Sequence, residues 1–459
     1  MIKNLILICV FLCFALVSSA QANDLESLAK KTISNNPDEV AKAIAELRQS
    51  KNNGLETLLK VFAPDIEKHL SGISPEQEPN WKKISQAIDT VSQQKDAHSS
   101  KLYWYTDFNQ AQEAAKRSGK PILSLRLLGN LIDDLSCANS RFFRTILYPN
   151  KEISEYLQQN YILHWKSVRP APKMTIDFGD GRKLERTITG NSIHYILDSE
   201  GNLVDALPGL HSPKAFLFWL NRSLIFAKQS FIGPNKEGLR LNYLQQYHRN
   251  SIAETGNRLA KELEIVGEKD ALTALTLGMI PNLGQLTFEN NQQQSGQIVQ
   301  TSNNESKAKA LDAAPIAMTK AIVEVPIIRQ MNNNLDEFKT VANDSTWNKL
   351  ASIYLSEVQL DNNSLILMRS KLSKGENTDP IAKIMDKLTF SIAKDTVYNE
   401  YLLHTQIHQW LLDARNYKDL EAFNDKVYAE LFLTPKTDPW LGLKSDDVYS
   451  AIEADGLVK

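Results

Sequence analysis

Cys137 is the residue of this chain best suited to chemistry. It begins the four-residue sequence Cys-Ala-Asn-Ser at positions 137–140, between an apolar segment and a segment with helical character. We therefore expect it at the N-terminus of a helix, where the helix dipole and the free backbone amides favour the nucleophilic thiolate. Arg141 and Arg144 follow on the same helical face and could stabilise that charge, and Ser140 could donate a hydrogen bond to the sulfur.

A thiolate at this position would act as a single thiol. The other two of the three cysteines, Cys9 and Cys13, lie close to the N-terminus. Cys137 could form a mixed disulfide with a thiol-containing protein or a small thiol, and an outside thiol would release it. In the alternative, the site is degenerate and the thiol is buried as a small apolar side chain. The exposure and acidity of Cys137 distinguish the two hypotheses.

A second group of candidate ligands lies near the C-terminus. Glu400, His404 and His408 fall within an arc of about 80° on an ideal helix, so they could face one ion. Imidazole and carboxylate groups are good zinc ligands. However, apolar residues at positions 403, 407, 410 and 411 form a stripe beside them, and one helix cannot easily surround a tetrahedral ion. We therefore expect no bound metal.

Other catalytic motifs are absent from the sequence. Ser192 and His194 would share one face of an extended segment, but the sequence around Ser192 lacks the final glycine of a nucleophile elbow. The chain contains no phosphate-binding loop, dinucleotide fingerprint or His-Glu-x-x-His motif. A formal net charge of −2 gives no indication of nucleic-acid binding. We therefore expect no cofactor and no nucleic-acid partner.

The N-terminus predicts export through a cleavable signal peptide. Residues 5–17 form an uninterrupted apolar run, which has the length of a signal-peptide core and is too short to span a bilayer. Ala20 and Ala22 are the small residues that signal peptidase requires, so we expect cleavage after Ala22, which would leave Cys137 as the only thiol. Since no later apolar run is long enough for a membrane helix, we expect a periplasmic or secreted protein without membrane insertion.

Helices and strands are expected to alternate around Cys137. The apolar runs and turn residues indicate the order helix, strand, helix, strand, hairpins and helix. The expected elements are a helix ending at Gly119, strands at residues 122–128 and 161–165, a hairpin turning at Asp180-Gly181, a hairpin turning at residues 198–202, and a helix beginning at Ser212-Pro213.

This order resembles the thioredoxin-like superfamily, in the branch with a Gly-Lys-Pro before the first core strand. The resemblance is carried by Ser-Gly-Lys-Pro-Ile-Leu at 118–123, by Cys137 opening a helix, and by Ile-Leu-Asp at 196–198 with Gly201 and Pro208-Gly209. It implies that Cys137 occupies the position of the first redox cysteine. The sequence departs from the family at Ser140, which replaces the second cysteine, at Leu135-Ser136, which replaces a tryptophan, and at Ser192-Ile193, which replaces a cis-proline facing the thiol.

The flanking regions are predicted to be helical. Asn36 is expected to cap a helix that starts at Pro37, and Asn53-Gly54 is expected to stop it. The irregular tail at residues 433–442 is expected to pack on the C-terminal helices. The chain is divided into a signal peptide (1–22), a helical N-terminal region (23–100), a thioredoxin-like domain (101–232), a helical segment (233–289), a polar low-complexity linker (290–310) and a helical C-terminal domain (311–459).

Two functional hypotheses follow for this α/β thioredoxin-like domain with N-terminal and C-terminal α-helical flanks. In the first, the protein resembles a thiol-disulfide oxidoreductase with a monothiol site. Cys137 is then the nucleophile, Ser140 is its hydrogen-bond partner, and Arg141 and Arg144 provide electrostatic support. In the second, the thioredoxin-like fold and the helical flanks form a non-catalytic binding or scaffold protein.

Overall fold

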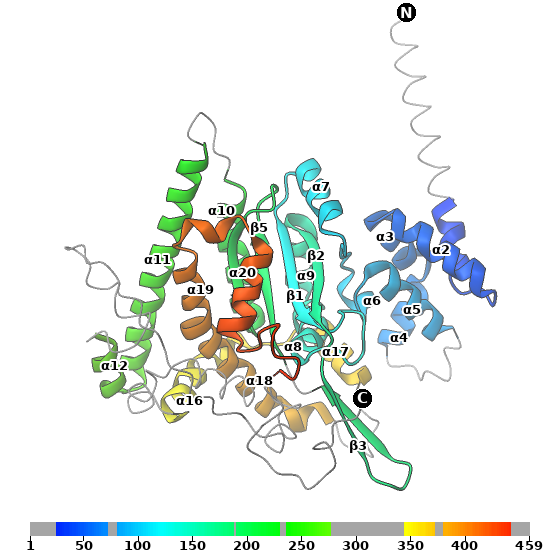
Figure 1. Ribbon diagram of the computed structural model, residues 1–459. Helices are drawn as coiled ribbons and strands as arrows, with labels where there is room; N and C mark the ends of the chain where they lie inside the picture. Colours follow the sequence, from blue (N-terminus) through cyan, green and yellow to red (C-terminus); the bar gives the residue numbers. More distant parts are fainter. Residues whose placement is uncertain are drawn as a thin grey trace, which may run out of the picture.

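The computed structural model describes residues 24–71, 80–187, 190–229, 236–276, 344–371 and 380–441. These residues form a mixed α/β structure in which helices surround a small sheet (Figure 1). The mixed α/β class and the helical flanks expected from the sequence are confirmed. The predicted signal peptide at 1–22 and the predicted linker at 290–310 lie outside the described residues.

The N-terminal region is helical, as expected. Its helices are α2 (Pro37–Gln49), α3 (Asn52–Val61), α4 (Ala63–Leu70), α5 (Trp81–Ser92) and α6 (Ala97–Ser100). The Asn36 side chain accepts hydrogen bonds from the backbone amides of Asp38 and Glu39, which confirms the predicted cap of α2. Apolar side chains of these helices form a hydrophobic cluster of their own.

The prediction that Asn53-Gly54 stops the first helix is wrong. Helix α2 already ends at Gln49, and Gly54 lies inside α3. A Cβ atom at position 54 would overlap the backbone carbonyl oxygen of Leu47 in α2. The glycine therefore allows the two helices to approach closely and does not serve as a helix stop.

A four-stranded sheet forms the centre of the structure. Its strands are β1 (Ile122–Leu128), β2 (Ile162–Arg169), β5 (Ser192–Leu197) and β6 (Leu203–Pro208), in the order β2-β1-β5-β6. Strand β1 is parallel to β2 and antiparallel to β5, and β6 is antiparallel to β5. The strand predicted at residues 122–128 is confirmed, and all of its residues are buried, including the polar Ser124 and Arg126 among its apolar side chains.

Three of the helices around the sheet confirm predicted boundaries, namely the end of a helix at Gly119, a helix opening at Cys137 and a helix start at Ser212-Pro213. They are α7 (Phe108–Ser118), α8 (Ala138–Phe142), the π-helical turn η2 (Phe143–Leu147), α9 (Lys151–Asn160) and α10 (Pro213–Ala227). Gly119 ends α7 with a φ of 70°, a value that glycine adopts readily. Ser212 caps α10 by accepting a hydrogen bond from the amide of Ala215 at 3.2 Å.

A separate hairpin extends away from the sheet (Figure 1). Its strands are β3 (Lys173–Asp177) and β4 (Lys183–Thr187), which pair only with each other among the described residues. The predicted Asp180-Gly181 turn lies between them. Most side chains of this hairpin are exposed or half-buried, so it contributes little to the core.

The C-terminal helices share the hydrophobic core of the sheet. They are α11 (Lys236–Ile265), α12 (Lys269–Thr276), α16 (Asp344–Ile353), η3 (Tyr354–Glu357), α17 (Asn362–Lys371), α18 (Pro380–Tyr398), η4 (Asn399–His404), α19 (Thr405–Trp410), η5 (Ala414–Tyr417), α20 (Leu420–Lys426) and η6 (Val427–Leu431). Buried residues such as Leu125 of β1 and Tyr401 of η4 belong to one cluster. The described C-terminal helices and the sheet therefore depend on each other for burial.

The C-terminal tail contacts the sheet as well as the helices. Arg169 at the end of β2 donates hydrogen bonds to the carbonyl oxygens of Thr434 at 2.8 Å and Asp438 at 2.9 Å. The amide of Thr434 donates to the carbonyl oxygen of Tyr428 in η6 at 2.7 Å. The predicted packing of the tail on the C-terminal helices is confirmed, and the tail also contacts the end of strand β2, which was not predicted.

Candidate functional site

Cys137 lies at the start of α8, as the sequence predicts. Its amide donates a hydrogen bond at 3.2 Å to the carbonyl oxygen of Leu128, the last residue of β1. The Cys137 side chain is 0% exposed and belongs to the core shared by the sheet and the C-terminal helices. Burial is the main cause that raises the pKa of Tyr148 and of Tyr428, and Cys137 adds to the effect on both.

The hydroxyl of Ser140 is engaged by other protein groups. It lies 2.7 Å from Ser136 Oγ and 2.9 Å from the backbone carbonyl oxygen of Cys137. Ser192, at the position where the resemblance implies a cis-proline, accepts a hydrogen bond from Asn139 Nδ2 at 2.7 Å. The structure therefore gathers these residues around the start of α8 and uses their polar groups to hold the loop together.

The two arginines hold neighbouring segments in place. Arg141 Nη2 donates to Thr187 Oγ1 at 2.9 Å, at the end of β4. The guanidinium group of Arg144 donates to the backbone carbonyl oxygens of Asp133 at 2.7 Å and Asp134 at 2.9 Å. Burial lowers the pKa of both arginines. Their observed hydrogen bonds fix the hairpin and the loop before α8.

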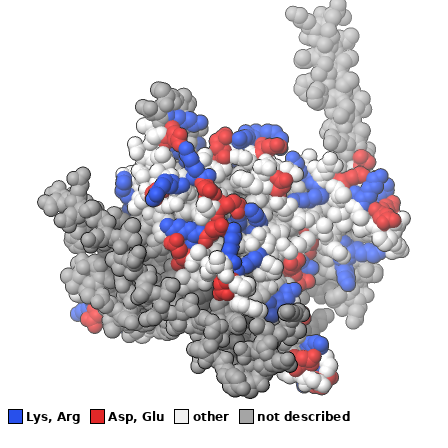
Figure 2. Space-filling model, viewed as in Figure 1, with Lys and Arg blue, Asp and Glu red and all other residues white. Residues whose placement is uncertain are grey.

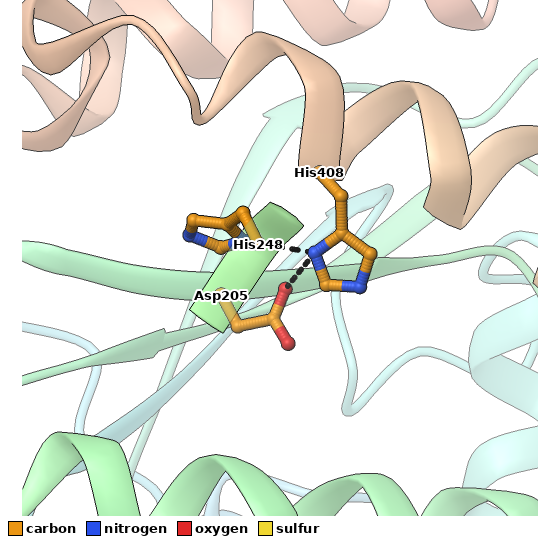
Figure 3. A group of neighbouring side chains, drawn as sticks. All are labelled: Asp205, His248 and His408. Atoms are coloured by element: carbon orange, nitrogen blue, oxygen red, sulfur yellow. Dashed lines mark hydrogen bonds and ion pairs between the residues drawn. The ribbon is translucent and has the colours of Figure 1, made fainter. Parts of the chain in front are cut away.

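A second group of reactive side chains lies at the edge of the sheet, where β6 meets α11 and α19 (Figure 3). Asp205, His248 and His408, called here the buried Asp–His cluster, each offer one ligand atom, and these atoms lie within 4.8 Å of one another. His408 Nδ1 lies 2.8 Å from His248 Nδ1 and 3.7 Å from Asp205 Oδ1. All three side chains are buried.

The Asp205 carboxylate is held from several sides. Its Oδ2 atom accepts hydrogen bonds from Trp219 Nε1 at 3.0 Å and from the Tyr247 hydroxyl at 2.5 Å. Its Oδ1 atom lies 3.3 Å from His404 Nε2. Burial opposes ionisation, but the charged His404 imidazolium beside it holds the pKa of Asp205 well below its ordinary range. The group is therefore a carboxylate with one oxygen directed at the imidazoles.

The imidazoles around Asp205 differ in protonation. Burial opposes the charged form of His404, but Asp205 and then Glu400 raise its pKa to about 9, so an imidazolium pairs with the carboxylate at pH 7. Burial lowers the pKa of His248 to about 4 and that of His408 well below its ordinary range. Both are therefore neutral at pH 7, which is the form of histidine that binds metal ions.

The candidate group of Glu400, His404 and His408, at which we expected no bound metal, does not converge on one point. Glu400 forms an ion pair with Arg258 at 2.6 Å, and its other oxygen lies 3.5 Å from His404 Nδ1. His408 belongs instead to the buried Asp–His cluster. The helix is not ideal here, because the π-helical turn η4 precedes α19 and breaks the regular spacing that the prediction assumed.

Sequence reasoning missed Asp205 and His248. Asp205 is the only charged residue of β6, a strand buried along its whole length, where a carboxylate without partners is costly. His248 lies on the buried face of α11, between Leu244 and Ile252. The charged residue in a buried strand and the histidine on an apolar helix face are both visible in the sequence. However, no local sequence pattern indicates that Asp205 and His248 lie close together in the fold.

No family model, curated protein or solved structure matches this chain. Among the described residues, no helix has the length and apolar character needed to cross a membrane. The function must therefore be inferred from the geometry of the chain itself.

Proposed function

We propose that this protein is an exported, non-catalytic interaction scaffold in which a thioredoxin-like domain carries partner-binding surfaces. The observation that carries the proposal is the burial of Cys137, whose side chain is 0% exposed. A thiolate must reach the sulfur atom of a disulfide to attack it, so a thiol without exposed surface is poorly placed for exchange. The polar groups of Ser140, Arg141 and Arg144 are already bound to other parts of the protein.

The arrangement of the sheet supports the thioredoxin-like part of the proposal. Strands β1 and β2 are parallel and are joined through α8 and α9, and the antiparallel hairpin β5–β6 leads into α10. This is the order of elements on which the sequence resemblance rests. Cys137 lies between β1 and α8, at the position that the resemblance implies for the first redox cysteine.

The β3–β4 hairpin offers a surface of the kind that a scaffold needs. Phe178, beside its turn, is 55% exposed. Since each strand pairs only with the other in the described part of the chain, the outer edges present backbone groups that can pair with a strand of another protein. The Arg141–Thr187 hydrogen bond anchors the base of the hairpin to the start of α8. In this proposal Arg141 positions the hairpin rather than a thiolate.

The face drawn in Figure 2 carries no large patch of one sign of charge on its described residues. Lysine and arginine side chains are interspersed with aspartate and glutamate side chains over the described part of that face. A mixed surface of this kind is compatible with a protein partner, whose contacts can depend on shape and backbone pairing rather than on one sign of charge.

The decisive test compares the rate at which iodoacetamide alkylates Cys137 in native and denatured protein at pH 8. If reaction requires an opening that costs about 4 kcal/mol or more, the native rate is at least about a thousandfold lower. As a control, Ser352→Cys in a Cys137→Ala background places a thiol at an exposed position of α16, which should react rapidly. Native labelling of Cys137 within about tenfold of that control would refute the scaffold proposal and favour the monothiol hypothesis.

The hairpin is tested by replacing residues 174–186 with a short Gly-Ser turn. Because no residue of the hairpin belongs to the core clusters, we expect the melting temperature to stay within about 2 °C of the parent protein. Loss of folding would show that the core requires the hairpin. In that case, the hairpin could not be assigned to partner binding.

A further inference from the structure

We infer that the buried Asp–His cluster binds one divalent transition-metal ion, and that zinc fits its ligands best. The inference depends on Asp205, His248 and His408 and is independent of the reactivity of Cys137. The three residues come from β6, α11 and α19. A bound ion would therefore join the edge of the sheet to two helices that lie far apart in the sequence.

The spacing of the three ligand atoms suits a single ion. In a tetrahedral zinc site with bonds of about 2.0–2.1 Å, neighbouring ligand atoms are about 3.3 Å apart. The separations of 2.8 Å between the two Nδ1 atoms and 3.7 Å between His408 Nδ1 and Asp205 Oδ1 lie on either side of that value. Figure 3 shows the two imidazoles facing each other with the carboxylate beside them. The third pair, His248 and Asp205, lies within the 4.8 Å that encloses all three ligand atoms.

The surrounding side chains hold the carboxylate in the orientation of a ligand. Trp219, Tyr247 and Ser223 all donate to Asp205 Oδ2, the last at 3.3 Å, so Oδ1 is the oxygen that faces the imidazoles. Hydrogen bonds of this kind fix ligand geometry and increase metal affinity. His404 Nε2, 3.3 Å from Oδ1, would supply the fourth ligand when metal binding displaces its proton.

The donor set indicates the class of ion. Calcium takes six to eight oxygen ligands and magnesium also prefers oxygen, whereas this cluster offers one carboxylate and two nitrogen donors. Imidazole with a carboxylate suits zinc and neighbouring transition metals. The most exposed of the three ligands, His408, is only 4% exposed, so the site has no open side for a substrate. The ion would therefore stabilise the packing of β6 against the helices rather than catalyse a reaction.

The first test uses the wild-type chain. Protein purified without chelator should contain about one zinc ion per chain by elemental analysis, and chelator-treated protein should rebind zinc and then melt at a higher temperature. Cobalt bound in place of zinc should give the intense visible absorption of a four-coordinate site. This signal reports on the geometry of the site without any substitution.

The second test uses matched variants and competition with a chromophoric chelator. His248→Gln and His408→Gln should each weaken zinc binding by at least about 100-fold. His98→Gln is the control, because His98 is also 4% exposed but lies in α6, and it should leave the affinity unchanged. The inference is overturned if the parent protein binds neither zinc nor cobalt at micromolar concentrations, or if the His98 variant loses as much affinity as the cluster variants. Cys137→Ala should retain zinc, which separates this test from that of the scaffold proposal.

Discussion

Lowering the pH from 7 to 5 should reduce the free energy of unfolding by about 2 kcal/mol through His164, and by the same amount through His194. His164 lies on β2, 2.8 Å from Ser124 Oγ, and His194 lies on β5, 2.7 Å from the Tyr148 hydroxyl. Burial is the main cause that lowers the pKa of each histidine to about 3. Both imidazoles are therefore neutral in the folded protein at pH 5.

The sign of the effect follows from the number of protons bound in each state. The unfolded chain has a histidine pKa of about 6.5, so at pH 5 it binds a proton at each position that the folded protein leaves neutral. The stability that these residues contribute is fully present above the unfolded pKa of about 6.5. It is lost as the pH falls from there toward the folded pKa of about 3. At pH 5 the loss depends almost entirely on the unfolded pKa, because the folded pKa lies far below the solution pH.

The assay is urea unfolding at pH 7 and at pH 5 for the parent protein, His164→Gln and His194→Gln. Each variant should show a difference in unfolding free energy between the two pH values that is about 2 kcal/mol smaller than that of the parent. The readout is this difference, so it is insensitive to a constant loss of stability in the variants. His69→Gln is the control, because it removes a half-buried histidine of the N-terminal helices. It should leave the pH-dependent contributions of His164 and His194 to the free energy of unfolding unchanged. A His194 imidazole that titrates near pH 6.5 by NMR in the folded protein would refute the reasoning.

Side-chain contacts and processing provide the remaining predictions. Glu421→Gln removes the carboxylate that lies 2.8 Å from the buried guanidinium of Arg126. Urea titrations should show that the free energy of unfolding falls by about 1–3 kcal/mol. An unchanged free energy of unfolding would contradict a stabilising role for this ion pair. Gly54→Ala should destabilise the protein by about 1–3 kcal/mol, because the added Cβ atom would overlap the neighbouring helix α2. In the control variant Gly238→Ala in α11, the added Cβ atom meets open space and should not destabilise the protein. Equal melting temperatures for the two variants would contradict the packing explanation. Intact mass of exported protein should place the first residue at Asn23, and retention of residues 1–22 would disprove the predicted cleavage.

The elements that the sequence predicts correctly are those with local determinants. Strand β1 is a mainly apolar run that is followed by a glycine, the β3–β4 hairpin has its Asp-Gly turn, and α10 begins at a serine cap. Gly54 is the instructive failure. Its local sequence resembles a helix stop, but its role is set by the neighbouring helix α2, which no local pattern reveals.

The environment of Cys137 shows where local inference ends. Its place at the start of α8 follows from the adjacent strand and helix, and this prediction is confirmed. Its complete burial depends on segments that are distant in sequence. Tyr428 of η6 belongs to the same buried cluster as Cys137 and donates a hydrogen bond to the carbonyl oxygen of Asn191 at 3.3 Å. The packing of segments that are distant in sequence therefore decides between an exposed and a buried thiol.

The contacts of the buried Asp–His cluster are also made by residues that lie far apart in the sequence, so no local pattern predicts them. A carboxylate buried in an edge strand needs compensation, and Trp219, Tyr247 and the His404 imidazolium supply it. That set is sufficient for an ion pair, so it does not explain why His248 and His408 place their Nδ1 atoms face to face at 2.8 Å beside the same carboxylate. A proton shared between the two imidazoles is the structural alternative, and it predicts that chelators and zinc leave the melting temperature unchanged. A metal ion accounts for both imidazoles and the carboxylate together, and it predicts a melting temperature that rises with zinc and falls with chelator.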